Sequence, residues 1–381
     1  MIYFDNAATT QLSENVKNRM IKEMDNFGNP SALYDLGISA EKIVTSACAN
    51  IAKKLKCTPD EIIFTSGGTE SDNTAIFGAA HAMSRRGNKI VTTAFEHSAV
   101  LEPMRVLEKE GFSVTYITPD ESGNIPISKF EDAIDKDTIL VSAMHINNET
   151  GVILPIDRVK SVIKAKGSDA LLHCDATQSF CKYNIEPEKW GIDLLTASAH
   201  KIHGPKGIGF LYCRKGVNIR QHLFGGLQQK GFRPGTEPTL LIAGFDEAIS
   251  DFGDPAENAK RVKEVKDRLC DKLSQLPDVI INSPENSSDY VLSVSVCGIK
   301  SETLLHFLED RQIYVSSGSA CSKGKLSHVM TALGYDKRRA DSVIRLSFSK
   351  NSKPSEADEL VNAVSAAQKV LIRAGMKGMG K

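Results

Sequence analysis

The sequence predicts an α/β fold: a mainly parallel, seven-stranded sheet in a large domain, followed by a smaller α+β domain. Seven short apolar runs alternate with helix-length segments between residues 61 and 213, which is typical of strands joined by crossover helices. Beyond residue 254 the pattern changes to a long charged helix, a new strand and a Gly/Ser-rich stretch. We therefore expect a large domain at 14–255 and a small domain made of 1–13 plus 256–381.

Each expected element has its own signal in the sequence. Apolar residues from Ile43 to Leu55 recur at helical spacing and predict a helix with one buried stripe. The strands are expected at EIIF (61–64), KIVTTA (89–94), SVTYI (113–117), TILVSAM (138–144), ALLHC (170–174), LLTAS (194–198) and GIGFLYC (207–213). The small domain is expected to contain a helix at 256–276, a strand at YVLSVSVC (290–297) and a final helix from Ser355, whose first turns are acidic.

Composition excludes several classes of protein. The 381 residues carry 47 Lys+Arg and 47 Asp+Glu, so no net field attracts nucleic acid or an anionic membrane. The N-terminus has neither a basic nor an apolar leader segment, and we expect neither secretion nor a membrane anchor. The eight cysteines are scattered without a CxxC pair, which favours reduced thiols in a cytoplasmic protein. No metal site is expected, because HExxH is absent and His200 with His203 is better explained by the loop around Lys201.

The residues after the expected strands are unusually polar, and ligands of such sheets bind at the carboxyl ends of the strands. TSGGTESDN follows the first strand, and its glycines with Thr69 suit a phosphate at a helix start, although Thr69 with Asp72 is also typical of an ordinary helix start without a ligand. Asp175 and Gln178 follow ALLHC, and Lys201 follows LLTAS. We expect these side chains to converge at one edge of the sheet.

A confined lysine and a carboxylate together suit pyridoxal phosphate, since Schiff-base chemistry needs the amine and a protonated pyridine nitrogen needs the acid. Taken singly, Asp175 could cap a helix and Lys201 could be a solvated loop lysine. Other cofactors have weaker support: GxGxxG is absent, and GSACSKGKL departs from a phosphate-binding loop in its spacing and at Leu326.

Six motifs, in this order along the chain, resemble the cysteine desulfurase family of the NifS/IscS type, within the class V aminotransferase group. They are TSGGTESDN (65–73), EHSAV (96–100), HINNETG (145–151), HCDATQS (173–179), SAHKIHGPKG (198–207) and SSGSAC (316–321), the last of which resembles the group I members. The resemblance extends from FDNAATT to about Ser349. It implies a pyridoxal phosphate-dependent transferase of fold type I that works as a homodimer.

The resemblance also implies roles for individual residues. Lys201 forms the Schiff base, Asp175 pairs with the pyridinium nitrogen, His97 stacks on the ring as an acid or base, and Arg345 holds the substrate carboxylate. The remaining cofactor-binding residues are Gly68, Thr69, Asn148, Gln178, Ser198, Ala199, His200 and, from across the dimer, Thr236. Asn148 also contacts the substrate. The alternative for His97 is a simple packing role.

Cys321 distinguishes a desulfurase from an ordinary transaminase, because removal of sulfur needs a nucleophile that attacks the substrate's sulfur atom. Cys48, Cys174, Cys213 and Cys297 lie in an apolar stripe or at strand ends, where a small core residue is expected. Lys323 and Lys325 supply positive charge that favours the Cys321 thiolate. The alternative is a surface loop with an incidental thiol.

The implied reaction converts L-cysteine to L-alanine and leaves a persulfide on Cys321, which passes to an iron–sulfur scaffold or a tRNA-thiolation enzyme. Cys321 lies only eleven residues before Ala332, so the cysteine loop is slightly short for a housekeeping member of the family. The chain ends soon after its last helix, without the extended tail with which such members bind an iron–sulfur scaffold, and this leaves the acceptor open. Two enzymatic alternatives remain, a selenocysteine lyase or another class V aminotransferase-like enzyme, and one non-enzymatic alternative, an inactive scaffold or regulator.

Overall fold

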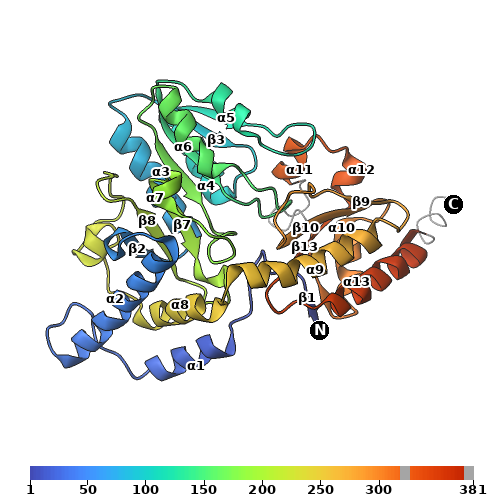
Figure 1. Ribbon diagram of the computed structural model, residues 1–381, viewed down its shortest axis with the longest axis horizontal. Coiled ribbons are helices and arrows are strands. Elements are labelled where there is room, and N and C mark those ends of the chain that lie inside the picture. The colour runs from blue at the N-terminus through green and yellow to red at the C-terminus, as the bar shows by residue number, and fades with distance from the viewer. Residues whose placement is uncertain (318–326, 373–381) are drawn as a thin grey trace.

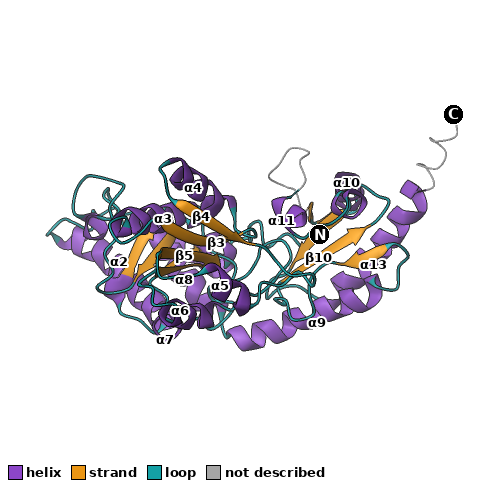
Figure 2. Cartoon of the chain, turned by 90° about the horizontal axis from the view of Figure 1, so that it is seen from above, coloured by secondary structure: helices purple, strands orange, loops and turns teal. Residues whose placement is uncertain are grey.

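The computed structural model describes residues 1–317 and 327–372 of the chain. The chain forms a large seven-stranded sheet with helices on both faces, and a four-stranded sheet that lies toward the other end of the long axis (Figure 1). Seen from above, helices line both sheets, and the last helix runs along the outer edge of the smaller one (Figure 2).

The seven-stranded sheet confirms the predicted fold class. Its strand order is β2-β8-β7-β6-β5-β3-β4, and only β8 runs antiparallel to its neighbours. The strands are β2 (Ile62–Thr65), β3 (Lys89–Thr93), β4 (Ser113–Ile117), β5 (Thr138–Met144), β6 (Leu171–Asp175), β7 (Leu194–Ser198) and β8 (Gly209–Cys213). Each of the seven apolar runs therefore forms one strand of this sheet.

Helices cover both faces of this sheet, so alternate strand residues enter two different cores. Ile62 and Phe64 of β2 belong to one buried cluster with residues of α2, α6 and α8, whereas Ile63 belongs to another cluster with residues of α3 and α4. The helices of this part are α1 (Glu14–Glu23), α2 (Asp35–Leu55), α3 (Gly68–Met83), α4 (Ser98–Lys109), α5 (Ile127–Ala133), α6 (Ile156–Ala165), α7 (Pro187–Trp190) and α8 (Thr239–Phe252), with 3-10 turns at η1 (Pro59–Glu61), η2 (Ala199–Lys201) and η3 (Gln228–Gly231).

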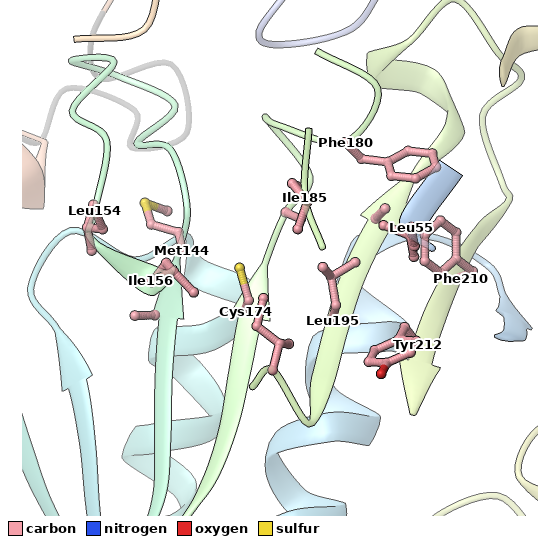
Figure 3. Close-up of a cluster of buried hydrophobic side chains, with 14 of the residues drawn as sticks. Leu55, Met144, Leu154, Ile156, Cys174, Phe180, Ile185, Leu195, Phe210 and Tyr212 are labelled. Carbon is pink, nitrogen blue, oxygen red and sulfur yellow. The ribbon is translucent and has the colours of Figure 1, made fainter. Parts of the chain in front are cut away.

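Two of the cysteines that the sequence assigns to the core are buried. Cys174 lies near Leu195 in the buried cluster that also contains Ile62 and Phe64 (Figure 3), and Cys297 is also buried. Cys48 and Cys213 are partly buried.

The smaller sheet is antiparallel, with the order β12-β13-β10-β9. Its strands are β9 (Val279–Ile281), β10 (Val291–Val296), β12 (Ser316–Ser317) and β13 (Val343–Ser347), and β1 (Ile2–Tyr3) pairs in parallel with β11 (Ile313–Tyr314). The helices are α9 (Pro255–Leu273), α10 (Ser301–Glu309), α11 (His328–Ala332), α12 (Lys337–Ala340) and α13 (Pro354–Ala367), which continues into the π-helical turn η4 (Gln368–Ile372). The N-terminal residues Ile2 and Phe4 pack into the same core as α9 and α13.

Candidate functional site

A cavity of about 770 Å³ lies at the carboxyl ends of the parallel strands. It is lined by most of the residues that the sequence singles out, which lie at the ends of five different strands or just after them, and on β13: Gly68, Thr69, His97, Asn148, Asp175, Gln178, Ser198, His200, Lys201 and Arg345. Ala199 is buried beside the cavity, and Thr236 is exposed between η3 and α8; neither lines it. Cys321 lies outside the described residues, but Ser317 and Ser327 on either side of them line the cavity.

One wall of the cavity is the N-terminus of α3. Gly67 is the residue before this helix and has φ = 147°, a conformation that side chains rarely adopt. A Cβ at Gly209 on the neighbouring strand β8 would come within 2.5 Å of a carbonyl oxygen and 2.8 Å of the Gly67 Cα. The glycines therefore let two backbone segments approach closely, and the sixteen-residue helix directs its free amides and positive dipole end at the cavity.

A helix does start at this motif, as the alternative interpretation of Thr69 and Asp72 expected, but its N-cap is Gly67 and not Thr69. Thr69 is the second residue of α3, and the amide of Ser66 instead donates to Glu70 Oε2 at 2.8 Å. Asp72 is buried at the cavity wall, where its Oδ1 lies 3.5 Å from His173 Nε2. Burial raises the pKa of Asp72 well above its usual value, and the nearby Asp175 carboxylate adds to this effect.

Asp175 ends β6, and a turn follows it rather than a helix, so it does not act as a helix cap. Its Oδ1 accepts a hydrogen bond from the amide of Thr177 at 2.8 Å, which fixes the carboxylate at the cavity wall. Gln178 donates from Nε2 to the carbonyl of Ala7 at 3.0 Å. Its Oε1 is buried and has no hydrogen-bond partner among the described residues.

Lys201 lines the cavity at the end of η2, directly after β7. Its Nζ donates to the carbonyls of Ala7 and Ala8 at 2.6 and 2.8 Å, which brings the N-terminal segment to the lysine. The neighbouring His200 has its pKa lowered to about 4, by burial first and then by the positive charge of Lys201.

His97 is the N-cap of α4 and accepts a hydrogen bond at Nδ1 from the amide of Ala99, at 3.1 Å. Since a backbone amide can only donate, the proton of a neutral His97 ring is at Nε2. Partial burial lowers the pKa of His97; Asp175 opposes this shift and Lys201 adds to it. The ring is therefore neutral at neutral pH.

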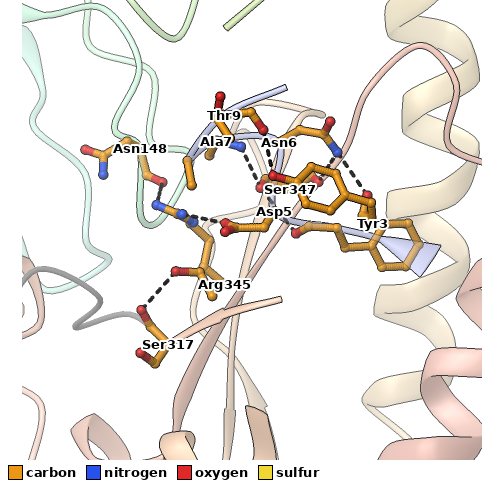
Figure 4. Close-up of polar contacts among 12 residues, drawn as sticks. Tyr3, Asp5, Asn6, Ala7, Thr9, Asn148, Ser317, Arg345 and Ser347 are labelled. Carbon is orange, nitrogen blue, oxygen red and sulfur yellow. Dashed lines mark hydrogen bonds and ion pairs between the residues drawn. The ribbon is translucent and has the colours of Figure 1, made fainter. Parts of the chain in front are cut away.

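Arg345 projects from the middle of β13 and lines the cavity opposite these groups. It donates from Nη1 to the backbone carbonyl of Asn148 at 3.1 Å and forms an ion pair from Nη2 to Asp5 Oδ1 at 2.8 Å (Figure 4). A guanidinium fixed in this way is suited to recognise a carboxylate by paired hydrogen bonds.

Several residues that shape the cavity were not predicted from the sequence. Asp5, Ala7 and Ala8 contact Arg345 and Lys201; the motif FDNAATT indicates the segment that contains them but not which residues they contact. Glu96 and Glu149 were also missed, although both lie inside quoted motifs. Glu149 lines the cavity and accepts a 2.6 Å hydrogen bond from Ser327 Oγ.

Comparison with known proteins identifies the family. Residues 2–360 match the family model "Aminotransferase class-V". The chain is 41% identical over 374 residues to the cysteine desulfurase IscS of Shewanella loihica, covering 95% of this chain and 91% of that protein. It is 38% identical over 372 residues to the IscS of Clostridium botulinum, covering 95% of this chain and 93% of that protein.

Solved structures agree with this assignment. A NifS-like protein superposes with a TM-score of 0.91 at 37% identity, covering 97% of this chain and 99% of that one. The structure described as SspA in complex with cysteine has a TM-score of 0.81 at 34% identity, covering 92% and 99% of the two chains. The chain thus belongs to the class V aminotransferases and, within them, to the cysteine desulfurase family of the NifS/IscS type.

Proteins of this family depend on pyridoxal phosphate, and the residues of the cavity fit this cofactor. The orphaned, buried Oε1 of Gln178 is an acceptor for a ring hydroxyl, and the glycine-lined N-terminus of α3 is an anion site. Within residues 1–317 and 327–372, no group of three or more His, Cys, Asp or Glu side chains is placed to hold a metal ion. None of the helices in this part of the chain combines the length and hydrophobicity of a membrane span.

Proposed function

We propose that this protein is a pyridoxal phosphate-dependent cysteine desulfurase, which converts L-cysteine to L-alanine and carries the sulfur as a persulfide on Cys321. The observation that carries the proposal is the meeting of Lys201, Asp175 and Arg345 in one cavity. The relatives named cysteine desulfurase, which match along 95% of the chain, support the same conclusion.

The cavity residues divide into groups that hold different parts of the cofactor. Lys201 would hold the aldehyde carbon, Asp175 would keep the ring nitrogen protonated, and Gln178 with Asn148 would contact the ring hydroxyl. The α3 terminus and the β7–η2 segment would hold the phosphate, with a contribution from a second copy of the chain: Gly68, Thr69, Ser198, Ala199, His200 and the second copy's Thr236. When bound, the cofactor supplies an electron sink that labilises the Cα–H bond and then the C–S bond of cysteine.

The chain's own residues bind and orient the substrate. Arg345 receives the α-carboxylate, and its bonds to Asn148 and Asp5 fix the plane of the guanidinium. His97, neutral at neutral pH, holds a proton at Nε2 for transfer at the ring face. These contacts place Cα next to an acid–base group.

Sulfur transfer needs a thiolate, and Cys321 is the cysteine assigned to this step. Its thiolate attacks the substrate sulfur, an S–S bond forms, the C–S bond breaks, and the carbon takes up a proton to become L-alanine; no further reductant is consumed. Burial raises the pKa values of Cys48 and Cys213 to about 11 and of Cys57 and Cys181 to about 12, which disfavours their thiolates.

We further propose that the enzyme is a cytoplasmic homodimer that delivers sulfur to an iron–sulfur scaffold or a tRNA-thiolation enzyme. Large apolar side chains are exposed in two stretches of the chain. The exposed fractions are 80% for Phe27 and 94% for Leu33 in the first stretch, and 82% for Phe224 and 88% for Leu227 in the second. Both stretches lie at the end of the molecule away from the four-stranded sheet (Figure 1), and Thr236 is exposed just beyond the second. A second copy of the chain on this end would cover the apolar surface and bring Thr236 to the neighbouring cavity.

The experiment is incubation of the purified holoenzyme with L-cysteine, with alanine and protein-bound persulfide measured in the same sample. We expect equal amounts of both in a single turnover, and no persulfide from Cys321→Ser, whose cofactor absorbance is retained. Undiminished sulfur release by Cys321→Ser would refute the assignment and favour a lyase or transaminase. Light scattering of the same sample measures the mass, and a monomer would contradict the dimer.

A further inference from the structure

The N-terminal segment Tyr3–Thr10 crosses the cavity and touches several of its polar side chains. The carbonyls of Ala7 and Ala8 accept hydrogen bonds from Lys201, and Ala7 also accepts one from Gln178. In the same segment, Asp5 pairs with Arg345. The first ten residues thus form a wall of the site, although they are nearly 200 residues from Lys201 in sequence.

Hydrogen bonds hold this segment against β13 (Figure 4). Asp5 forms a parallel bridge with Ser347, and the Ala7 amide donates to Ser347 Oγ at 2.8 Å. The Asn6 side chain donates to the Ser347 carbonyl at 2.9 Å, and Tyr3 OH donates to the Thr9 carbonyl at 2.8 Å. Since Arg345 lies two residues before Ser347 on the same strand, the contacts with Ser347, and not the Tyr3 bond inside the segment, fix Asp5 beside the guanidinium.

Two carboxylates act on Arg345 from different segments. Asp5 contacts Nη2 at 2.8 Å, and Glu149 follows Asn148, whose backbone carbonyl accepts from Nη1. The Arg345 side chain is only 9% exposed, so its charge needs a counter-ion. Burial raises the pKa of Glu149 to about 7, and the hydrogen bond from Ser327 and then the charge of Arg345 oppose this rise, so Glu149 lies within electrostatic reach of the guanidinium. Without Asp5, Glu149 would be the carboxyl group left to compete for the guanidinium.

We propose that Asp5 is a positioning residue for Arg345. Asp5 holds the Arg345 guanidinium away from Glu149, so that the remaining N–H groups of the guanidinium face a substrate carboxylate. This inference rests on the proposed function only in naming that carboxylate as the one of cysteine. Asp5 contributes orientation, and its own negative charge is partly screened because its side chain is 22% exposed. The carboxylate of the N-terminal segment thus determines the affinity for the substrate's acidic end.

The test separates the two ends of the substrate with two fragments. 3-Mercaptopropionate has the carboxylate of cysteine and lacks its amine, whereas cysteamine has the amine and lacks the carboxylate. Calorimetry gives the Kd of 3-mercaptopropionate for the holoenzyme, and the change in cofactor absorbance gives the reaction rate with cysteamine. For Asp5→Ala we expect the Kd to rise about tenfold, as for loss of a charge-assisted contact, with the cysteamine rate unchanged.

Three further variants complete the design. Asp5→Asn keeps an acceptor oxygen, and we expect its Kd to rise about threefold; it carries the test if Asp5→Ala fails to fold. Tyr3→Phe removes a bond that holds the same segment but does not involve Arg345, and it should bind 3-mercaptopropionate like wild type. The double variant Asp5→Ala with Glu149→Gln removes the competing carboxylate, and its Kd should return toward the wild-type value.

Two results would overturn the proposal. An unchanged or lower Kd in Asp5→Ala would show that Asp5 only competes with the ligand for Arg345. A parallel loss of cysteamine reaction and 3-mercaptopropionate binding would show a general structural role. Neither outcome depends on sulfur transfer: a wild-type enzyme that binds 3-mercaptopropionate but releases no alanine from cysteine would refute the proposed function and leave the role of Asp5 intact.

Discussion

Glu96 offers a quantitative test of how the cavity wall is built. It is fully buried between β3 and β5, directly before His97. Its carboxyl accepts from Thr93 Oγ1 at 2.6 Å and from the amide of Met144 at 3.0 Å through both oxygens, which ties the ends of the two strands together. Burial raises the pKa of Glu96 from 4.5 to about 8, although its hydrogen bonds oppose the shift.

Because the pKa of Glu96 is raised in the folded chain, the free energy of unfolding should fall as the pH rises. Between pH 4.5 and 8 the folded chain holds a proton at Glu96 that the unfolded chain has released, so folding becomes less favourable as the pH rises through this window. Each pH unit inside the window lowers the free energy of unfolding by about 1.36 kcal/mol. Between pH 6 and 8 the Glu96 carboxyl alone therefore removes about 2 to 3 kcal/mol from it.

The assay compares wild type with Glu96→Gln, which cannot ionise, by urea unfolding at pH 6, 7 and 8 with cofactor in excess. Relative to wild type, the variant should gain about 2 to 3 kcal/mol between pH 6 and 8. Glu121→Gln, an exposed carboxyl in the turn after β4, is the control and should show a constant difference. A difference for Glu96→Gln that does not change with pH, or that changes in the opposite direction, would refute the reasoning.

Three further predictions test separate parts of the account. Gly209→Ala places a Cβ 2.5 Å from a backbone carbonyl oxygen of β7, and we expect a loss of about 1 to 3 kcal/mol of unfolding free energy with weaker cofactor binding, measured by urea unfolding and by absorbance titration. Asp193→Ala leaves Lys160 and Arg214 without their shared, fully buried carboxylate partner; we expect a loss of about 3 kcal/mol, and a loss below 1 kcal/mol would mean that the cations find other partners. Arg345→Lys removes the two-pronged contact, and the KM for cysteine should rise at least about tenfold while kcat changes less; an unchanged KM would contradict the role of Arg345.

The sequence predicted the large sheet because its signals are local. TILVSAM forms β5 over Thr138–Met144, and all seven of its residues are buried. A strand buried on both faces needs a continuous apolar run, so each strand could be located without knowledge of its neighbours. Asp175 and Lys201 could be placed at one edge for the same reason, since both directly follow such runs.

The remaining parts depend on contacts between distant segments. Asp5 and Arg345 are 340 residues apart, and the sequence around neither one indicates the pairing. The antiparallel direction of β8 could not be predicted either, because the apolar run GFLYC does not indicate in which direction the strand runs. The burial of Asp72 was also not predicted, because its spacing from Thr69 indicates only a helix start, whereas α3 begins at Gly68 and buries the carboxyl group.

The proposed function depends on Lys201 being the lysine that binds the cofactor. Lys182 is the strongest rival: it is buried, and its pKa is lowered to about 7 by burial and then by the charge of Lys201. The measurement is borohydride reduction of the holoenzyme followed by peptide mass spectrometry. We predict a pyridoxyl group on Lys201, and its absence from Lys201, or its presence on Lys182 instead, would contradict the account.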